Sequence, residues 1–198
     1  QILDLNQPTE QLVAQMSQPV RNIYRNYHKK DIKIHQSTNP EDIDILLTFV
    51  HQVAERTGIR PHSDDYFRQQ ATTLFPLNAA RLWYATVNDA PIAAALLYYT
   101  DSTLYYAHAG ASVLPEHRKL NAGTALLASA IIDAQSRGLT TADLYGIAPN
   151  GASPKHPWAG FTRFKQSFGG SGVTFGGAWD LPLRPLPYWL YRTYQSLR

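Results

Sequence analysis

Apolar positions recur along this chain with two different periods, and the change of period divides it into a helical first part and a β-rich second part. Before residue 80, the spacing is mainly that of amphipathic helices. It predicts helices over 6–16, 19–29, 40–56 and 63–74, and short strands over 2–5 and 32–35. Asn39 and Ser63 are suited to capping the third and fourth helices, and Gly58 to ending the third.

Beyond residue 80, alternating and β-branched runs predominate. They predict strands over 81–87, 92–99, 104–111, 140–145 and 173–181, with a hairpin turn at 88–91 between the first two. A long Ala/Leu/Ile-rich helix is expected over 121–137, and a last helix over 187–197. Antiparallel hairpins followed by a β-α-β unit favour an α/β sandwich, and we find no repeat or linker.

One segment combines a clear pattern with reactive side chains. Residues 143–147 are typical of a strand, and a loop leads from them to a short helix between Pro157 and Gly169-Gly170. At about 100° per residue, one face of this helix carries Trp158, Phe161, Phe164, Phe168 and also Lys165. A cation on an aromatic face costs desolvation unless something uses it. Spacing alone favours the alternative, a lysine stem that covers the aromatics while its ammonium reaches water.

Composition narrows the possible functions. With 198 residues, of which 44% are hydrophobic, the chain can bury one core, so one domain is expected. The net charge of +3 permits phosphate ligands without requiring them. The absence of cysteine excludes disulfides and thiolate chemistry. The seven histidines show no metal-ligand spacing, so no metal is predicted, and no serine lies in a nucleophile motif.

The aromatic helix resembles the C-terminal signature of the Fem-type aminoacyltransferases, which extend the peptide of peptidoglycan precursors from aminoacyl-tRNA. The resemblance implies that Phe164 and Lys165 lie where the donor ester meets the acceptor amine. It gives Lys165 the task of stabilising the oxyanion of the tetrahedral intermediate. A fixed cation aimed at developing negative charge is in any case a large catalytic term. No cofactor is implied, because the donor ester is already activated.

The resemblance also implies a fold and a set of partners. Fem-type proteins contain two domains related to the GCN5-type N-acetyltransferases (GNAT), and residues 1–198 resemble the second. We therefore expect a single α/β domain of GNAT type, a mixed sheet flanked by helices, that forms the C-terminal half of a two-domain bacterial cytoplasmic protein. The implied partners are aminoacyl-tRNA and a UDP-linked or lipid-linked muramyl pentapeptide, with peripheral contact with the inner membrane face left open.

Two arginines and one tyrosine are candidates for binding the acceptor. Arg21 and Arg25 share a helix face without nearby acids, and segment 19–27 resembles the family helix whose arginine binds the nucleotide-sugar diphosphate. By position this arginine is Arg21, while Arg25 replaces an aromatic residue of some members. Tyr66 matches a tyrosine that holds the acceptor's sugar or phosphate. The alternatives are a solvated surface for the arginines and simple packing for Tyr66.

The loop before the long helix is a candidate donor site. Coenzyme A-dependent acetyltransferases have the pattern Arg-x-x-Gly-x-Gly/Ala here, whose backbone N–H groups bind a pyrophosphate. Arg118 and Gly123 fit this pattern, but Asn121 replaces the first glycine. We interpret the loop as one that no longer binds coenzyme A and whose Arg118 meets tRNA phosphates. The alternative is an ordinary helix start with an Asn cap.

Two further features have both a functional and a plainer interpretation. Asp143, at a strand end, could orient the acceptor amine, although a hydrogen bond to backbone is favoured. The tail over 181–198, rich in Tyr, Trp and Arg, suits a bilayer interface, although docking on the domain through Trp189 and Leu190 is favoured.

The function predicted from the sequence is therefore aminoacyl transfer from tRNA to an amine of a peptidoglycan precursor. A coenzyme A-dependent N-acyltransferase and a non-catalytic precursor-binding domain remain as alternatives.

Overall fold

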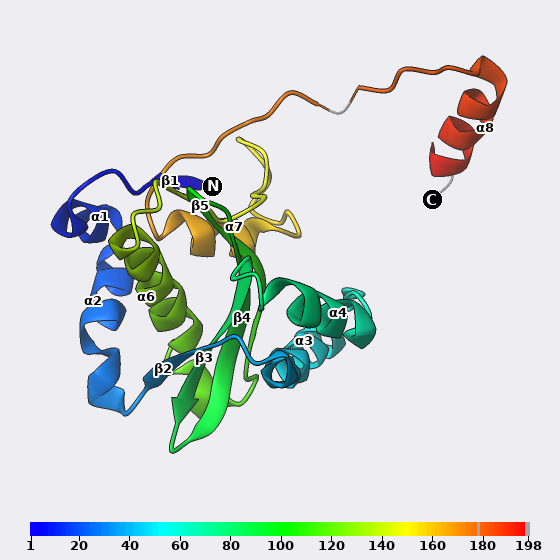
Figure 1. The fold of residues 1–198 in the computed structure, drawn as a ribbon. Coiled ribbons are helices and arrows are strands. Elements are labelled where there is room, and N and C mark those ends of the chain that lie inside the picture. Colours follow the sequence, from blue (N-terminus) through cyan, green and yellow to red (C-terminus); the bar gives the residue numbers. More distant parts are fainter. Residues whose placement is uncertain (178, 197–198) are drawn as a thin grey trace.

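The computed structural model describes residues 1–177 and 179–196 and consists of one mixed sheet with helices on both faces (Figure 1). The strands are β1 Ile2–Asp4, β2 Lys33–Ser37, β3 Ala80–Val87, β4 Ala90–Tyr99, β5 Thr103–Ala111 and β6 Thr141–Asp143. The helices are α1 Thr9–Gln15, α2 Gln18–Asn26, α3 Ile43–Thr57, α4 Asp64–Leu74, α5 Pro115–Arg118, α6 Ala122–Ser136, α7 Ala159–Gln166 and α8 Pro185–Ser196. Two short 3-10 helices lie at Tyr27–Lys30 and Pro40–Asp42. The predicted fold class is confirmed.

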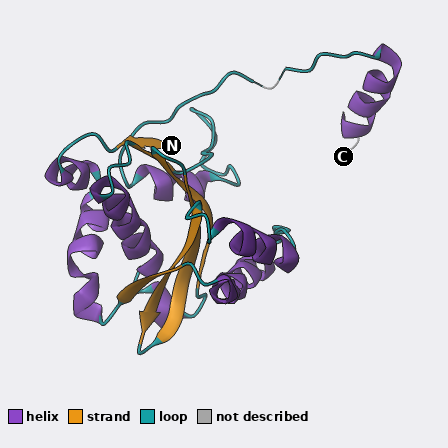
Figure 2. Ribbon diagram, in the orientation of Figure 1, coloured by secondary structure: helices purple, strands orange, loops and turns teal. Residues whose placement is uncertain are grey.

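The sheet separates two hydrophobic cores. Its strand order is β1-β6-β5-β4-β3-β2, and every neighbouring pair is antiparallel except β5 and β6. Helices α1, α2 and α6 cover one face, and α3 and α4 cover the other (Figures 1 and 2). The Ala-rich side of α6 allows close packing: Ala125, Ala128 and Ala130 are fully buried in the first core. Leu46, Phe67 and similar residues fill the second.

Local signals in the sequence act where they were predicted. The side chain of Asn39 accepts a hydrogen bond from the Glu41 amide, and Ser63 does the same for Tyr66. Gly58 ends α3 in the left-handed conformation with a φ of 71°. The β3–β4 hairpin turns through Asn88 and Asp89, whose φ angles of 49° and 60° fit a tight two-residue turn.

Strand β5 is irregular on both of its sides. It pairs with β6 only over Thr103–Tyr105, so the second half of β5 has no neighbour on that side. On the other side, Leu97 pairs with Tyr106 and Leu96 with His108, which leaves Ala107 as an extra residue in a β-bulge. The two irregularities open the sheet at its centre.

The strand predicted over 173–181 is absent from the described residues of that range, and this prediction was wrong. The chain makes one antiparallel bridge, between Ile2 and Ser171, and then leaves the sheet. The edge strand β1 is only three residues long, so it offers no further pairing. Ala178, within the predicted strand, lies outside the described residues.

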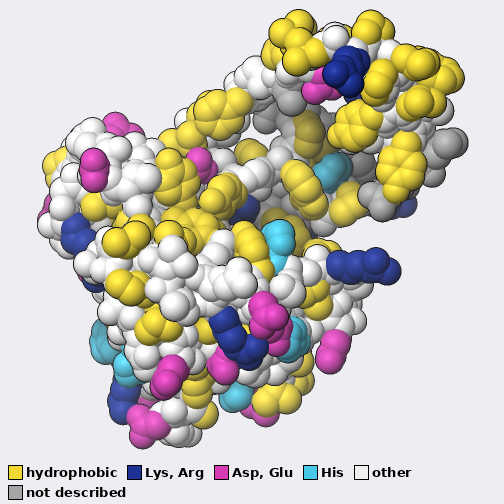
Figure 3. All heavy atoms as spheres, turned by 45° about the vertical axis from the view of Figure 1, so that its right-hand side comes forward, with side chains coloured by type: hydrophobic (Ala, Val, Ile, Leu, Met, Phe, Trp, Pro, Cys, Tyr) yellow, Lys and Arg dark blue, Asp and Glu magenta, His cyan; other side chains and the backbone are white. Residues whose placement is uncertain are grey.

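The C-terminal segment is also different from the expectation. Helix α8 was expected to dock on the domain through Trp189 and Leu190, but these side chains are 61% and 56% exposed. The helix stands apart from the sheet at the end of an extended connection, which corrects the expectation that no linker is present (Figure 1). Hydrophobic side chains gather on this segment (Figure 3). Leu197, the last residue of the predicted helix, lies outside the described residues.

Helix α3 approaches β5 so closely that only glycine fits at the contact. A Cβ atom at Gly110 would lie 2.7 Å from Cβ of Phe49 and 2.8 Å from its carbonyl carbon. We expect Gly110→Ala to destabilise the fold by about 1–3 kcal/mol, because the Phe49 backbone must move. Thermal unfolding should show a melting temperature lower by roughly 3–8 °C.

Gly160→Ala is the matched control. A Cβ atom at Gly160 would meet nothing within 4 Å. This helical position should gain about 0.5–1 kcal/mol of stability. Equal melting temperatures for the two variants would contradict the close contact of α3 with β5.

Candidate active site

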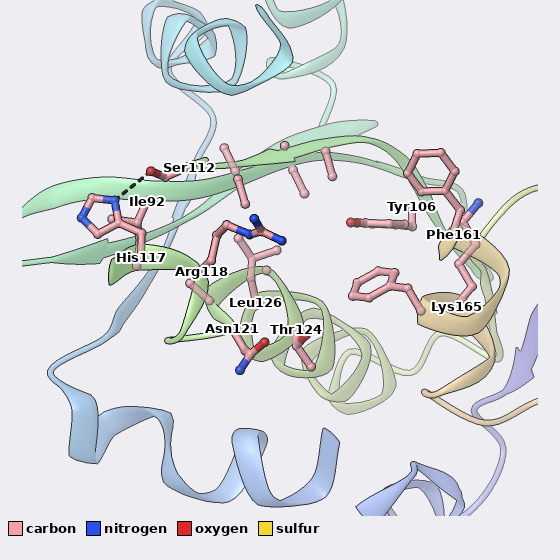
Figure 4. A pocket seen from close by; sticks show the side chains of 18 of the residues that line it. Ile92, Tyr106, Ser112, His117, Arg118, Asn121, Thr124, Leu126, Phe161 and Lys165 are labelled. Atoms are coloured by element: carbon pink, nitrogen blue, oxygen red, sulfur yellow. Dashed lines mark hydrogen bonds between the residues drawn. The ribbon is translucent and has the colours of Figure 1, made fainter. Parts of the chain in front are cut away.

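The opening beside β5 forms a first pocket of about 620 Å³. Its walls come from the second half of β5, the start of α6, and α7. Phe164, Lys165 and Arg118, three of the candidate residues, line it together. Figure 4 shows Arg118 and Lys165 toward opposite ends of the pocket, with Tyr106 and Phe161 near Lys165. The first pocket therefore has a cation at each end and aromatic side chains around one of them.

The ammonium group of Lys165 is held at the pocket wall. Its Nζ donates a hydrogen bond of 2.8 Å to the carbonyl oxygen of Gly146. Burial lowers the pKa of Lys165 from its usual value, while the carboxylate of Asp143 acts in the opposite direction. The side chain is half-buried, and it lines the pocket with Phe161 and Phe164 as its predicted helix face requires. One hydrogen bond leaves two N–H groups of the ammonium able to donate to a ligand.

Tyr106 adds a hydroxyl group to the aromatic end. Its ring lies 6.3 Å from that of Phe164, and its hydroxyl points toward the middle of the pocket (Figure 4). Burial raises the pKa of Tyr106 well above its usual value, so the hydroxyl stays protonated. Within the described chain, no residue hydrogen-bonds to this hydroxyl. It is therefore available as a donor.

The opposite end of the first pocket is suited to an anion. Arg118 ends the short helix α5, and the N-terminus of α6 follows it. Asn121 lies between them in the left-handed conformation, with φ 56° and ψ 39°, so it takes up the backbone shape that a glycine would provide there. The first N–H groups of a helix, here those of Ala122 and Gly123, have no partner within the helix. Both residues line the pocket.

A buried hydroxyl fixes the loop that carries Arg118. Nδ1 of His117 lies 2.8 Å from Oγ of Ser112, and Ser112 is buried. The same hydroxyl accepts from the amide of Leu114. The loop is thus tied to the end of β5, and Arg118 is tied with it.

A second pocket, of about 480 Å³, lies behind Lys165 and contains Asp143 and Tyr145. Oδ1 of Asp143 accepts a hydrogen bond of 2.7 Å from the Tyr145 amide, the backbone contact that the sequence favoured. Tyr145 has a φ of 63°, a strained value for a bulky residue. Gly146 lines this second pocket and also accepts the hydrogen bond of Lys165. Asp143 therefore neighbours Lys165 without sharing the first pocket.

A third pocket, of about 320 Å³, lies on the α3 side of the sheet. His62 and His108 line it together with Phe67. Tyr66 stacks on His62 with ring centroids 4.1 Å apart and meets His108 edge-on at 6.3 Å. Tyr66 therefore lies beside the third pocket, 36% exposed. Burial, and secondarily His62, lowers the pKa of His108.

The bulge at Ala107 brings the first and third pockets to one strand. Residues two apart in a regular strand share a face, but the extra residue turns Tyr106 and His108 to opposite faces. Tyr106 lines the first pocket and His108 the third, and both pockets include Ala107 and Ala109. The two pockets therefore meet at the backbone of β5.

Arg21 and Arg25 lie apart from these three pockets. Nη1 of Arg21 donates to the carbonyl oxygen of Ala14 at 2.9 Å and also to that of Met16. Arg21 thus secures the end of α1, and Arg25 is exposed on α2. The structure brings neither arginine to Lys165.

Sequence reasoning did not single out Tyr106, His108 or the His117–Ser112 contact. Alternation puts Tyr106 and His108 on one face, and a one-residue bulge leaves no clear mark in the sequence. Among the described residues, no group of three or more His, Cys, Asp or Glu side chains could hold a metal ion. No described helix has both the length and the apolar character needed to cross a membrane.

Comparison with known proteins gives a family and several structural relatives. The sequence model of the family described as "Acetyltransferase (GNAT) domain" matches residues 16–165. No protein of curated function matches the chain. The crystal structure of FemX is similar, with a TM-score of 0.75 and 15% identity, over 84% of this chain and 57% of that chain.

Two other structures share the fold with lower scores. A possible acetyltransferase from Clostridium difficile 630 has a TM-score of 0.54 and 15% identity, over 76% of this chain and 98% of that chain. The C-terminal domain of a putative lysylphosphatidylglycerol synthetase from Agrobacterium fabrum has a TM-score of 0.55 and 14% identity, over 85% and 52%. The chain thus spans little more than half of FemX and of the synthetase domain.

The lowered pKa of His108 predicts how stability depends on pH. Because the folded pKa lies below that of the unfolded chain, the unfolded state binds more protons between the two values. Stability should therefore fall as pH drops below the ordinary histidine pKa of about 6.5. We expect the melting temperature to fall more in the wild type than in His108→Gln between about pH 7.5 and 5.5. Parallel curves would contradict a buried, neutral His108.

Proposed function

The chain belongs to the acetyltransferase (GNAT) family, and from this premise we propose that it is an acyltransferase that uses aminoacyl-tRNA. The proposed acceptor is an amine on the peptide stem of a peptidoglycan precursor. The observation that carries this proposal is the half-buried ammonium of Lys165, held by Gly146 at the aromatic end of the first pocket. A cation in this position is suited to an acyl carbonyl whose oxygen becomes negative during transfer.

The two ends of the first pocket correspond to the two ends of such a donor. An aminoacyl ester on a terminal ribose has a reactive carbonyl at one end and phosphates at the other. Phe161 and Phe164 provide an aromatic wall beside Lys165, against which a carbonyl group is removed from water. Arg118 and the first N–H groups of α6 provide the anion-binding end.

The reaction would then need no cofactor. The acceptor amine attacks the ester carbonyl carbon, and Lys165 stabilises the oxyanion of the tetrahedral intermediate. The C–N bond forms, the C–O bond to the ribose breaks, and the ribose hydroxyl leaves with a proton. Phe164 shapes the pocket around the reacting carbon.

The relatives support this assignment over a simple acetyl transfer. The chain is similar to FemX over 84% of its length. It is also similar to a protein whose name describes a lysyl derivative of a phospholipid. Both likenesses, at 15% and 14% identity, concern the fold, and the substrates remain part of our proposal.

The acceptor would be a UDP-linked or lipid-linked muramyl pentapeptide. Tyr66, beside the third pocket, is close enough to His62 and His108 to contact an acceptor that enters there. Arg21 and Arg25 would bind the acceptor's phosphates on α2, and Arg21 would have to share its guanidinium with the end of α1. Asp143 would act through its influence on Lys165.

A coenzyme A-dependent N-acyltransferase is the second candidate, because of Asn121. Its left-handed conformation preserves the backbone shape of a phosphate-binding loop although the glycine is missing. Arg118 and Gly123 line the pocket at this end. The same loop could thus bind a pyrophosphate.

Replacing Lys165 tests the proposed mechanism. We expect Lys165→Met to lower the transfer rate about 100-fold or more, since a positioned donor for an oxyanion contributes at least this much. The melting temperature should stay at or slightly above that of the wild type, because a desolvated charge is removed. The wild-type rate should fall at alkaline pH, below the usual lysine value. Single-turnover transfer from aminoacyl-tRNA and thermal unfolding measure these quantities.

Arg163→Met is the control for charge and helix content. Arg163 lies on the same helix but is exposed and does not line the first pocket. This variant should transfer at the wild-type rate. Full activity of Lys165→Met would remove Lys165 from the mechanism.

Ligand-induced stabilisation distinguishes the two candidate donors. A ligand at 100 times its Kd raises stability by about 2.7 kcal/mol. We expect aminoacyl-tRNA and UDP-linked muramyl pentapeptide to raise the melting temperature and acetyl-coenzyme A to leave it unchanged. Arg118→Met should weaken the response to the donor alone. Stabilisation by acetyl-coenzyme A only would favour the second candidate.

A further inference from the structure

His108 lies where the first and third pockets approach each other most closely. It follows the bulged residue Ala107, whose backbone belongs to both pockets. Its imidazole faces the third pocket, while Tyr106 faces the first. A group in the third pocket that reaches past His108 would therefore meet the wall of the first pocket.

The imidazole of His108 has neighbours but no fixed hydrogen bond. Phe67, His62 and Tyr66 surround it edge-on, with ring centroids at 4.9, 5.9 and 6.3 Å. Among the described residues, none hydrogen-bonds to the ring nitrogens. His35, by contrast, is bound to Thr86 at 3.0 Å. A partly open imidazole without a partner can accept a proton from a ligand.

The groups that face His108 favour its neutral form. They are His62 from the loop before α4, Tyr66 from α4 and Tyr98 from β4, with Arg60 also on the pocket lining. None of these is an acid that would stabilise an imidazolium ion. The lowered pKa of His108 agrees with this arrangement.

The third pocket has the lining that an amine on an apolar arm would need. Val50, Val53 and Ile59 form an apolar side, and Arg60 provides one cation. The imidazole of His108 forms part of the β5 side. An alkyl chain can thus lie along the valines, an acidic group of the same ligand can reach Arg60, and the amine can reach His108.

A packing role alone does not account for these features. A histidine that only fills an aromatic cluster is usually hydrogen-bonded or fully enclosed. His108 is only half-buried, and it lines a pocket of about 320 Å³.

We propose that the third pocket admits the acceptor amine and that His108 takes a proton from its ammonium form before attack. This role rests on the proposed function, since it needs an acyl donor in the first pocket. The protonated acceptor has no lone pair, so it must lose one proton to His108. The free amine then forms the C–N bond as the ester C–O bond breaks, and its second proton leaves with the alcohol. His108 returns its proton to water.

The test compares His108→Gln with His35→Gln. Both replace a histidine on a strand by an amide, but His35 lines none of the three pockets. With UDP-linked muramyl pentapeptide as acceptor, we expect His108→Gln to lower kcat about 100-fold or more, because general base catalysis contributes at least this much. KM should change little, and the rate should lose its dependence on a group that titrates below the usual histidine pKa. His35→Gln should behave like the wild type.

A second measurement separates a chemical role from a structural one. In His108→Ala, added imidazole should restore part of the transfer rate, which a loss of packing would not allow. Wild-type kinetics of His108→Gln, or no rescue of His108→Ala, would overturn the role of His108 while leaving the transfer activity in place.

Binding can be followed without any turnover. In ¹⁵N-histidine NMR spectra, the muramyl pentapeptide should shift the His108 and His62 resonances and leave that of His35 unchanged. Unchanged His108 resonances with a bound peptide would exclude the third pocket as the acceptor site. Shifted resonances in a protein that transfers no aminoacyl group would instead count against the proposed function.

Discussion

The single extra residue in β5 is the feature on which the rest of the site depends. Without the bulge at Ala107, Tyr106 and His108 would lie on the same face of the sheet. With it, the phenol and the imidazole reach opposite faces from almost the same height on the strand. The short pairing of β5 with β6 then leaves the backbone next to the bulge uncovered. An irregular ladder thus creates two pockets that share one wall.

The surrounding elements hold this wall in place. Phe49 of α3 packs against β5 at Gly110, where no side chain fits. Across the sheet, Phe168 is fully buried at the end of α7 and Phe164 packs on the same core, so Lys165 is aimed from a well-anchored helix. The Gly146 carbonyl then limits the freedom of the ammonium itself. Each polar group of the site is therefore positioned by a rigid contact in its own layer.

The sequence predicted the elements better than their contacts. Caps such as Asn39 and Ser63 act locally, so the helices they begin were correctly located. The aromatic face that carries Lys165 was also predicted, because helical period alone determines it. The bulge could not be predicted, since it depends on how β4 and β5 pair rather than on either strand. The strand expected over 173–181 failed for a similar reason: its alternation was real, but the three residues of β1 offered no edge to pair with.

The wall shared by the two pockets also bears on the order of events during turnover. Donor and acceptor would enter from opposite sides of the sheet, so neither substrate needs to depart before the other arrives. Such a protein favours a sequential mechanism, with both substrates bound in a ternary complex, over a double displacement through a modified enzyme. Product release can then begin on either side. The strand would act as a partition through which only the reacting atoms meet.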